Sequence, residues 1–135
     1  MDRLFLDANV LFSAAYQPKA GLLRLWKLKN VTLCSFRYAV AEANLNLEDE
    51  DQRKRLAVLA EKLQLFEASD HRLPPGITLP EKDVPILLAA IAARASHLLT
   101  GDVRDFGLYF GKKIEGVMIF FAGRVFKRYE MTESR

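Results

Sequence analysis

Four short apolar runs, separated by segments with helical periodicity, constrain the fold of this chain more than any other feature. The runs span residues 3–7, 31–35, 97–102 and 116–120. Runs this short and this apolar are typical of strands that are buried on both faces, and helices between them connect parallel neighbours. The sequence therefore predicts an α/β fold, a three-layer α/β/α arrangement with a central parallel sheet.

The intervening helices are predicted from the spacing of apolar residues. The strongest helical period in the chain runs from Val84 to Ala95. Residues 68–80 contain three prolines and a glycine and are predicted to form a loop. The other predicted helices span residues 9–16, 20–29, 36–47 and 48–66.

Composition bounds the class of protein. With 135 residues, half of them apolar, residues 1–135 are expected to form one domain with its own core. The single cysteine, Cys34, lies in an apolar run, so we expect a small core residue in a reducing, cytoplasmic setting. The N-terminus resembles neither a signal peptide nor a membrane span. A net charge of +3 permits an anionic partner without requiring one.

Acidic residues follow two of the predicted strands. Ligand sites in parallel α/β sheets lie beyond the carboxyl ends of the strands, where Asp7 and Asp102 are expected. Each also has a simpler interpretation as a helix N-cap, which contributes about 1 kcal/mol. Asp83, before Val84 and Pro85, has the same two interpretations because proline suits the first turn of a helix.

Glu42 is harder to explain as a local structural residue. On a helix its neighbours Tyr38, Ala41 and Leu45 form an apolar stripe, and positions 38, 39, 45 and 46 carry no basic residue. Burying an unpaired carboxylate is costly. We therefore expect either an arginine from a distant segment or a bound cation to compensate the charge of Glu42.

Taken together, these carboxylates predict a cation site. Two carboxylates about 4 Å apart repel each other by roughly 4 kcal/mol at an effective dielectric constant of 20. Oxygen ligands without histidine or cysteine favour Mg²⁺ or Mn²⁺. Asp7 would hold the metal, and Asn9 would orient Asp7 or a bound phosphate. His71 is expected to be an exposed loop residue and His97 a structural residue, and neither is expected to bind metal.

Three motifs, "LFLDANVLFSA" (4–14), "SFRYAVAE" (35–42) and "KDVPILLAAIAARASHLLTGDVRDF" (82–106), together resemble a PIN domain. This metal-dependent nuclease fold includes the toxins of VapBC toxin–antitoxin pairs, and the resemblance spans residues 3 to about 120. It implies a PIN-like fold in which the metal-binding, catalytic acids are Asp7, Glu42, Asp83 and Asp102, with Asp105 as an auxiliary ligand and Asn9 and Thr100 in support. The chain departs from the family pattern at residues 120–123, where a polar or proline-bearing turn is expected.

The resemblance implies an endoribonuclease that uses one or two Mg²⁺ or Mn²⁺ ions to cut RNA, leaving 5′-phosphate and 3′-hydroxyl ends. It also implies a cognate antitoxin as partner and a homodimer. Basic residues near the C-terminus are candidates for contacts to the RNA backbone, although ordinary surface charge is the alternative for each. These candidates are Arg104, Lys112, Lys113, Arg124, Lys127 and Arg128.

Two other functions compete with this interpretation. A PIN-like module that binds RNA or protein without cutting is disfavoured because all four acids are present. An aspartate-based phosphotransferase on a similar sheet usually needs a second aspartate two residues after the first. Position 9 is asparagine, which disfavours that function.

Overall fold

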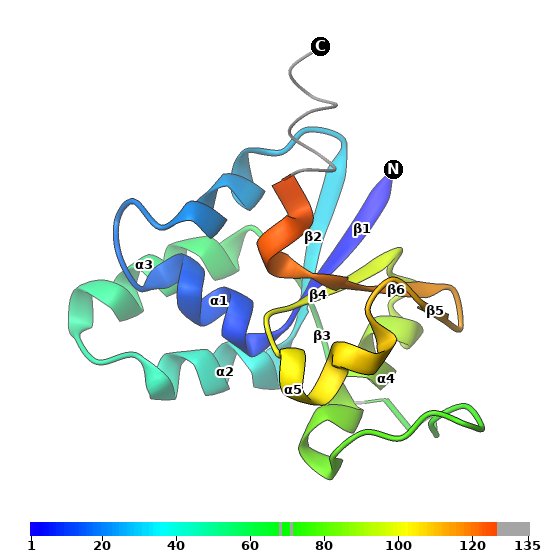
Figure 1. Cartoon of the computed structure of the whole chain (residues 1–135). Helices are drawn as coiled ribbons and strands as arrows, with labels where there is room; N and C mark the ends of the chain where they lie inside the picture. Colours follow the sequence, from blue (N-terminus) through cyan, green and yellow to red (C-terminus); the bar gives the residue numbers. More distant parts are fainter. Residues whose placement is uncertain (68, 71, 127–135) are drawn as a thin grey trace.

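The computed structural model describes residues 1–67, 69–70 and 72–126, which contain one six-stranded sheet in the order β3-β2-β1-β4-β6-β5 (Figure 1). All neighbouring strands pair in parallel except β5, which is antiparallel to β6. The predicted central parallel sheet is thus confirmed, with an antiparallel strand at one edge. The strands are β1 (Asp2–Leu6), β2 (Val31–Phe36), β3 (Gln64–Phe66), β4 (His97–Thr100), β5 (Lys113–Ile114) and β6 (Val117–Phe121).

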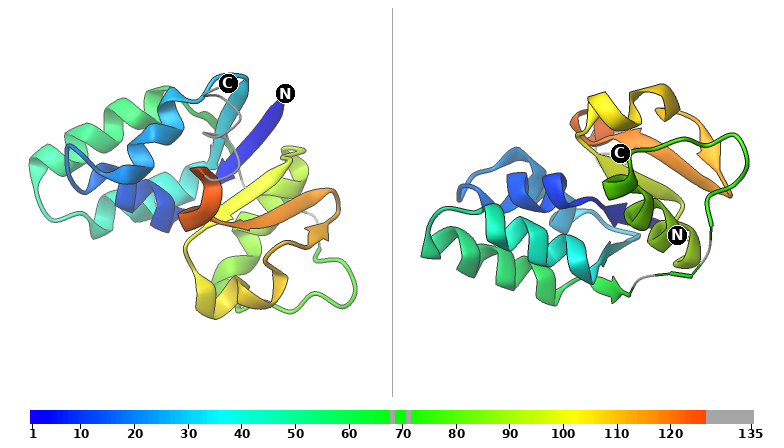
Figure 2. Two further views of the ribbon diagram at one scale, coloured as in Figure 1. Left: turned by 45° about the horizontal axis from the view of Figure 1, so that its top comes forward. Right: turned by 90° about the horizontal axis from the view of Figure 1, so that it is seen from below.

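Helices cover both faces of this sheet. Helices α1, α2 and α3 pack together on one face, whereas α4 lies on the other (Figures 1 and 2). Right-handed crossovers explain this division, because the chain moves one way through β1, β2 and β3 and then returns to β4. The three-layer fold is therefore confirmed. The α-helices are α1 (Ala8–Ala15), α2 (Arg37–Asn46), α3 (Glu50–Glu61), α4 (Val84–Ala92) and α5 (Val103–Phe106).

Short 3₁₀ helices complete the described chain. The predicted helix at residues 20–29 is one of them, η1, rather than an α-helix. No helix of the described residues is long and apolar enough to cross a membrane. The 3₁₀ helices are η1 (Gly21–Lys27), η2 (Glu81–Asp83), η3 (Gly107–Tyr109) and η4 (Ala122–Arg124).

The core is centred on β1 and β4, the two middle strands. Leu4, Phe5 and Leu6 of β1 are completely buried, as are Leu98 and Leu99 of β4. Because a helical layer lies on each side, both faces of these strands are covered, which explains their continuous apolar runs. Cys34 of β2 is also buried as a free thiol, in agreement with its predicted place in the core.

Two strands were not predicted from the sequence. The helix predicted over residues 48–66 ends at Glu61, and the chain then forms β3 beside β2. The predicted helix extends too far because Leu63 continues the helical spacing of Leu56 and Leu59 beyond the actual end of the helix. Strand β5 is joined to β6 by a two-residue turn in which Glu115 and Gly116 have φ values of 49° and 86°, typical of a tight hairpin.

The departure from the family pattern at residues 120–123 has a local explanation. The chain leaves β6 at Phe121 and enters η4 directly. A Cβ on Gly123 would lie 2.5 Å from Cε2 of the Phe121 ring. The aromatic side chain thus occupies the space that a side chain at position 123 would need.

Helix α2 corrects one prediction about Glu42. Its buried residues are Ala39 and Ala43, whereas Tyr38 and Leu45 are 67% and 80% exposed and Glu42 is exposed with them. The expected burial of Glu42 in an apolar stripe is therefore wrong. The helix carries two apolar stripes, and the alanine stripe packs inward while the larger side chains face solvent.

Candidate active site

The acids predicted to act together line one pocket of about 400 Å³ at the carboxyl ends of the central strands. Asp7 follows β1, Asp102 follows β4, Glu42 comes from α2, and Asp83 ends η2. The strand order reverses beside β1, which has β2 on one side and β4 on the other. Parallel sheets place ligands at such a reversal. The fold thus collects four carboxylates where this topology provides a binding crevice.

Asp7 both caps a helix and faces the pocket. Its Oδ1 accepts a hydrogen bond from the Ala8 N–H at 2.7 Å, so the N-cap interpretation is correct. Its Oδ2 accepts from Thr100 Oγ1 at 2.8 Å and from Asn9 Nδ2 at 3.2 Å. Burial raises the pKa of the Asp7 carboxyl, the charges of Glu42 and Asp102 add to this, and the hydrogen bonds from Thr100 and Ala8 oppose it.

Thr100 and Asn9 join the ends of β1 and β4. The Asn9 side chain donates to Thr100 Oγ1 at 3.2 Å and accepts from the Gly101 N–H at 2.8 Å. The Asp102 N–H also donates to Thr100 Oγ1, at 3.1 Å. One buried hydroxyl therefore contacts both Asp7 and the backbone of Asp102, which fixes the two acids relative to each other.

Asp83 is the acid that the fold leaves unsatisfied. It occupies the N-cap position of α4 but makes no capping hydrogen bond with its side chain, so its interpretation as a simple cap is wrong. The residue is 8% exposed, and its Oδ2 is buried with no hydrogen-bond partner among the described residues. Burial, reinforced by a hydrogen bond with Asp105 and by the charges of Asp105 and Asp102, raises the pKa of Asp83 to about 7.

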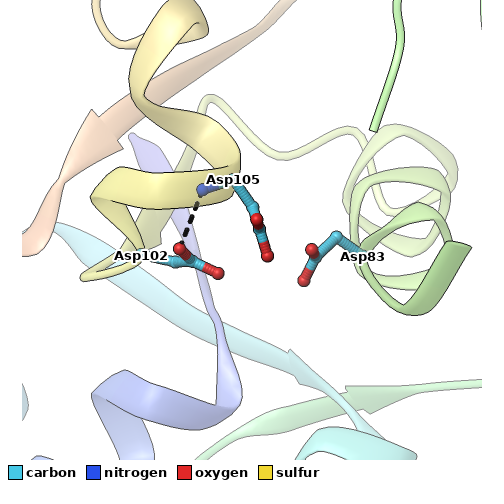
Figure 3. A group of neighbouring side chains, drawn as sticks. All are labelled: Asp83, Asp102 and Asp105. Atoms are coloured by element: carbon cyan, nitrogen blue, oxygen red, sulfur yellow. Dashed lines mark hydrogen bonds between the residues drawn. The ribbon is translucent and has the colours of Figure 1, made fainter. Parts of the chain in front are cut away.

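Asp102 and Asp105 complete a compact acidic group with Asp83 (Figure 3). One carboxylate oxygen from each lies within 4.8 Å of the others. Asp102 caps α5 by accepting from the Asp105 N–H at 2.9 Å. Contacts with Asp83 and Lys82 hold the pKa of Asp105 below its usual range. Asp7 and Glu42 line the same pocket but are not part of this closest group.

The residues at this site fit a hard divalent cation. A buried carboxylate oxygen without a hydrogen-bond donor is costly, and a cation would satisfy Asp83 Oδ2. The pocket offers carboxylate oxygens with no histidine or cysteine among its lining residues, a donor set that suits oxygen-preferring metals. The alternative explanation for Glu42, an arginine partner, finds no support, because no cation pairs with Glu42 among the residues described.

Several residues that line the pocket were not predicted from the sequence. Tyr38 and Asn46 flank Glu42 at a spacing of four residues on α2, and all three line the pocket. That spacing is the signal that would have identified one face of α2 as the site face. Phe12 and Phe36 add an aromatic wall, and the Phe36 ring lies 6.0 Å from the Tyr38 ring between centroids.

Lys82 is a further missed residue. It lines the pocket beside Asp83, and its ammonium lies 3.1 Å from Asp105 Oδ2. The hydrogen bond to Asp105, with the charges of Asp83 and Asp105, raises the pKa of Lys82. A lysine at the start of a helix gives no sequence signal that distinguishes it from ordinary surface charge.

The four predicted RNA-contacting residues that the structure describes are not among the residues that line the pocket. Arg104 is exposed on α5, Lys113 lies in the edge strand β5 with Lys112 just before it, and Arg124 is exposed in η4. Their roles stay predictions. His71, Lys127 and Arg128 lie outside the described residues, and His97 is buried in β4.

Comparison with known proteins gives a family and a fold. A family model described as "PIN domain" matches residues 3–104. A chain of the crystal structure of VapBC2 from Rickettsia felis, bound to a DNA fragment from their promoter, superposes with a TM-score of 0.66 at 18% identity, over 88% of this chain and 98% of that chain. A chain of the structure of FitAB bound to an IR36 DNA fragment superposes with a TM-score of 0.52 at 17% identity, over 88% of this chain and 94% of that chain. A search of curated proteins found no significant match.

Replacing Thr100 with valine tests the connection between Asp7 and Asp102. Valine keeps the shape and suits a strand, but it leaves the partly buried Asp102 N–H and the buried Asp7 Oδ2 without the hydroxyl. We expect Thr100→Val to lower the free energy of unfolding by about 1 to 3 kcal/mol in urea titrations. Thr100→Ser keeps the hydroxyl, so its free energy of unfolding should fall less than that of Thr100→Val. Equal stability of the valine variant and the wild type would contradict this role.

The raised pKa of Asp83 predicts a pH dependence of stability in metal-free protein. Folded Asp83 keeps its proton up to about pH 7, whereas the unfolded chain releases it near the ordinary value of 3.8. Between these values the folded state binds more protons, so the free energy of unfolding falls as pH rises. Asp83→Asn removes this loss of roughly 1.4 kcal/mol per unit between the two pKa values.

Urea titrations in EDTA at pH 4, 5, 6 and 7 would measure this effect. The difference in free energy of unfolding between Asp83→Asn and the wild type should grow with pH, in favour of the variant. Asp70→Asn, at an exposed position, should follow the wild-type profile. Parallel profiles for the wild type and Asp83→Asn would mean that Asp83 ionises normally.

Proposed function

Because this chain belongs to the PIN domain family, we propose that it is a metal-dependent endoribonuclease that hydrolyses RNA phosphodiester bonds in its acidic pocket. The observation that carries the proposal is the convergence of Asp7, Glu42, Asp83 and Asp102 on one pocket. These residues come from four separate segments, so ordinary helix capping does not explain why they meet. PIN domains are generally nucleases, which supports the same conclusion.

We assign Mg²⁺ or Mn²⁺ to this pocket, held by Asp83 and Asp102 with Asp7, Glu42 and Asp105 contributing. When bound, the ion supplies charge neutralisation and Lewis-acid polarisation of the scissile phosphate. The protein's own residues prepare the acids for this role. Thr100 and Asn9 orient Asp7 Oδ2. Asp83 Oδ2 has no hydrogen-bond donor in the described part of the chain and is available as a ligand.

The aromatic wall of the pocket favours single-stranded RNA as substrate. Phe12, Phe36 and Tyr38 line the pocket beside the acids, and the Tyr38 side chain is mostly exposed. Aromatic side chains bind unpaired bases by stacking, which a base inside a duplex cannot do. We therefore expect cleavage in loops and single strands, with 5′-phosphate and 3′-hydroxyl products.

We further propose that the protein is the toxin of a toxin–antitoxin pair. Its fold resembles chains of the VapBC2 and FitAB structures, each of which was solved bound to DNA. The proposed partner is a DNA-binding antitoxin. A homodimer, a single domain over residues 1–135 and a cytoplasmic location remain part of this proposal. The competing possibility is a PIN-like module that binds RNA or protein without cutting it.

Metal binding should stabilise the fold. Mg²⁺ or Mn²⁺ would relieve repulsion among the pocket acids, and at a hundredfold excess over its Kd a ligand adds about 2.7 kcal/mol to the free energy of unfolding. For a protein of this size that corresponds to a rise in Tm of several degrees. Thermal melts with EDTA, Mg²⁺ or Mn²⁺ measure it. An unchanged Tm at millimolar metal would argue against a metal site.

Cleavage of RNA by the wild type and by Glu42→Gln tests the activity. Purified protein with Mn²⁺ should cut single-stranded RNA, and Glu42→Gln should reduce the rate by about 100-fold or more, the scale of losing one charge-stabilising group. Glu42 is exposed and pairs with no described cation, so the Tm of the Glu42→Gln variant should stay at the wild-type value. Rates come from gel analysis of a labelled RNA.

Glu61→Gln, at an exposed position on α3 outside the pocket, is the matched control and should cut normally. RNA binding without cutting by the wild type would favour the inactive module. Cutting that persists in EDTA, or 2′,3′-cyclic phosphate ends, would contradict a metal-dependent hydrolysis. Full activity of Glu42→Gln would remove Glu42 from the site.

A further inference from the structure

Lys82 is the one cationic residue among the described residues that line the acidic pocket. Its side chain is 73% exposed, and its ammonium pairs with Asp105 Oδ2 at 3.1 Å. A lysine ammonium has three N–H donors. One donor is used by Asp105. Because Lys82 lines the pocket with a mostly exposed side chain, it lies at the rim, where its other donors are accessible to an incoming anion.

The Lys82 side chain begins in one element of the fold and its ammonium contacts another. Lys82 lies in the short helix η2 beside buried Asp83, whose N–H donates to the Pro80 carbonyl at 2.9 Å. Asp105, which holds the tip of the lysine, is itself 12% exposed at the side chain, and its N–H donates to Asp102. The charge is thus held beside the acids by two elements, η2 and α5, that are far apart in the sequence.

Besides the metal assigned to this pocket, a cationic side chain beside the acids would reduce their repulsion of an anionic substrate. A phosphate that approaches to about 4 Å from a carboxylate meets a repulsion of roughly 4 kcal/mol at an effective dielectric constant of 20. The pocket presents four such carboxylates. Lysine binds phosphate as a compact point charge, and a charge held at the rim would contact the RNA backbone as it enters.

We propose that Lys82 binds a phosphodiester of the RNA at the rim of the pocket. This inference rests on the proposed function and adds a substrate-binding residue to it.

The chain offers a closely matched control in Lys54. Lys54 lies on α3, its side chain is 71% exposed, and it pairs with a single acid, Glu50, at 3.9 Å. It differs from Lys82 in that it does not line the pocket. Comparing Lys82→Met with Lys54→Met therefore separates a contact at the pocket from a general loss of positive charge.

The test measures binding of a fluorescently labelled single-stranded RNA by fluorescence anisotropy. The titrations contain Ca²⁺ and are repeated at several KCl concentrations. Gels check that the RNA stays intact. Lys82→Met should raise the Kd about tenfold. It should also reduce the slope of log Kd against log[KCl] by about 0.7, the value for one phosphate contact on a single strand. Lys82→Arg should keep the slope, and Lys54→Met should keep both slope and Kd.

The outcomes distinguish this inference from the proposed function. A wild-type Kd and slope in Lys82→Met overturn the role of Lys82, even if the wild type cuts RNA. An equal loss of slope in Lys54→Met overturns it as well. A loss of slope confined to Lys82→Met supports it, even if the wild type binds without cutting, a result that overturns the nuclease alone. A wild type that neither binds nor cuts RNA overturns both.

Discussion

Repulsion among carboxylates is the constraint around which this end of the molecule is organised. The metal-free fold relieves it in three different ways. Asp7 receives hydrogen bonds from Thr100 and Asn9, Asp83 holds its proton up to about neutral pH, and Asp105 pairs with Lys82. Each device lowers the cost of bringing negative groups together. None of them supplies a donor to Asp83 Oδ2, so the arrangement remains suited to a cation.

The central part of the fold follows directly from the sequence, and its edges do not. Strands β1, β2, β4 and β6 are recognisable because they contain continuous apolar runs between helical segments. Strands β3 and β5, at the two edges of the sheet, have three and two residues. Segments this short carry no measurable periodicity, and their pairing depends on the neighbouring strand that receives them. The sequence therefore predicts the sheet but not its full width.

The candidate site residues were predictable where an acidic residue directly follows a strand. Asp7 and Asp102 come directly after β1 and β4, and the topology of a parallel sheet brings such positions together. The environment of Glu42 was not predictable, because α2 has apolar residues on two sides and only packing decides which side is buried. The role of Lys82 depends on α5, which is distant in sequence, so no local pattern indicates it. Sequence identifies the acids, and tertiary structure identifies what surrounds them.

The hydrogen bonds that link Asn9 and Asp7 to Gly101 and Thr100 join residues more than 90 positions apart. They also require β1 and β4 to lie side by side. During synthesis on the ribosome, the early segments that carry Asp7 and Glu42 emerge long before Asp83 and Asp102. The complete pocket therefore cannot assemble until β4 and the residues after it have left the exit tunnel. Until that point a growing chain carries two of the four pocket acids without the other two.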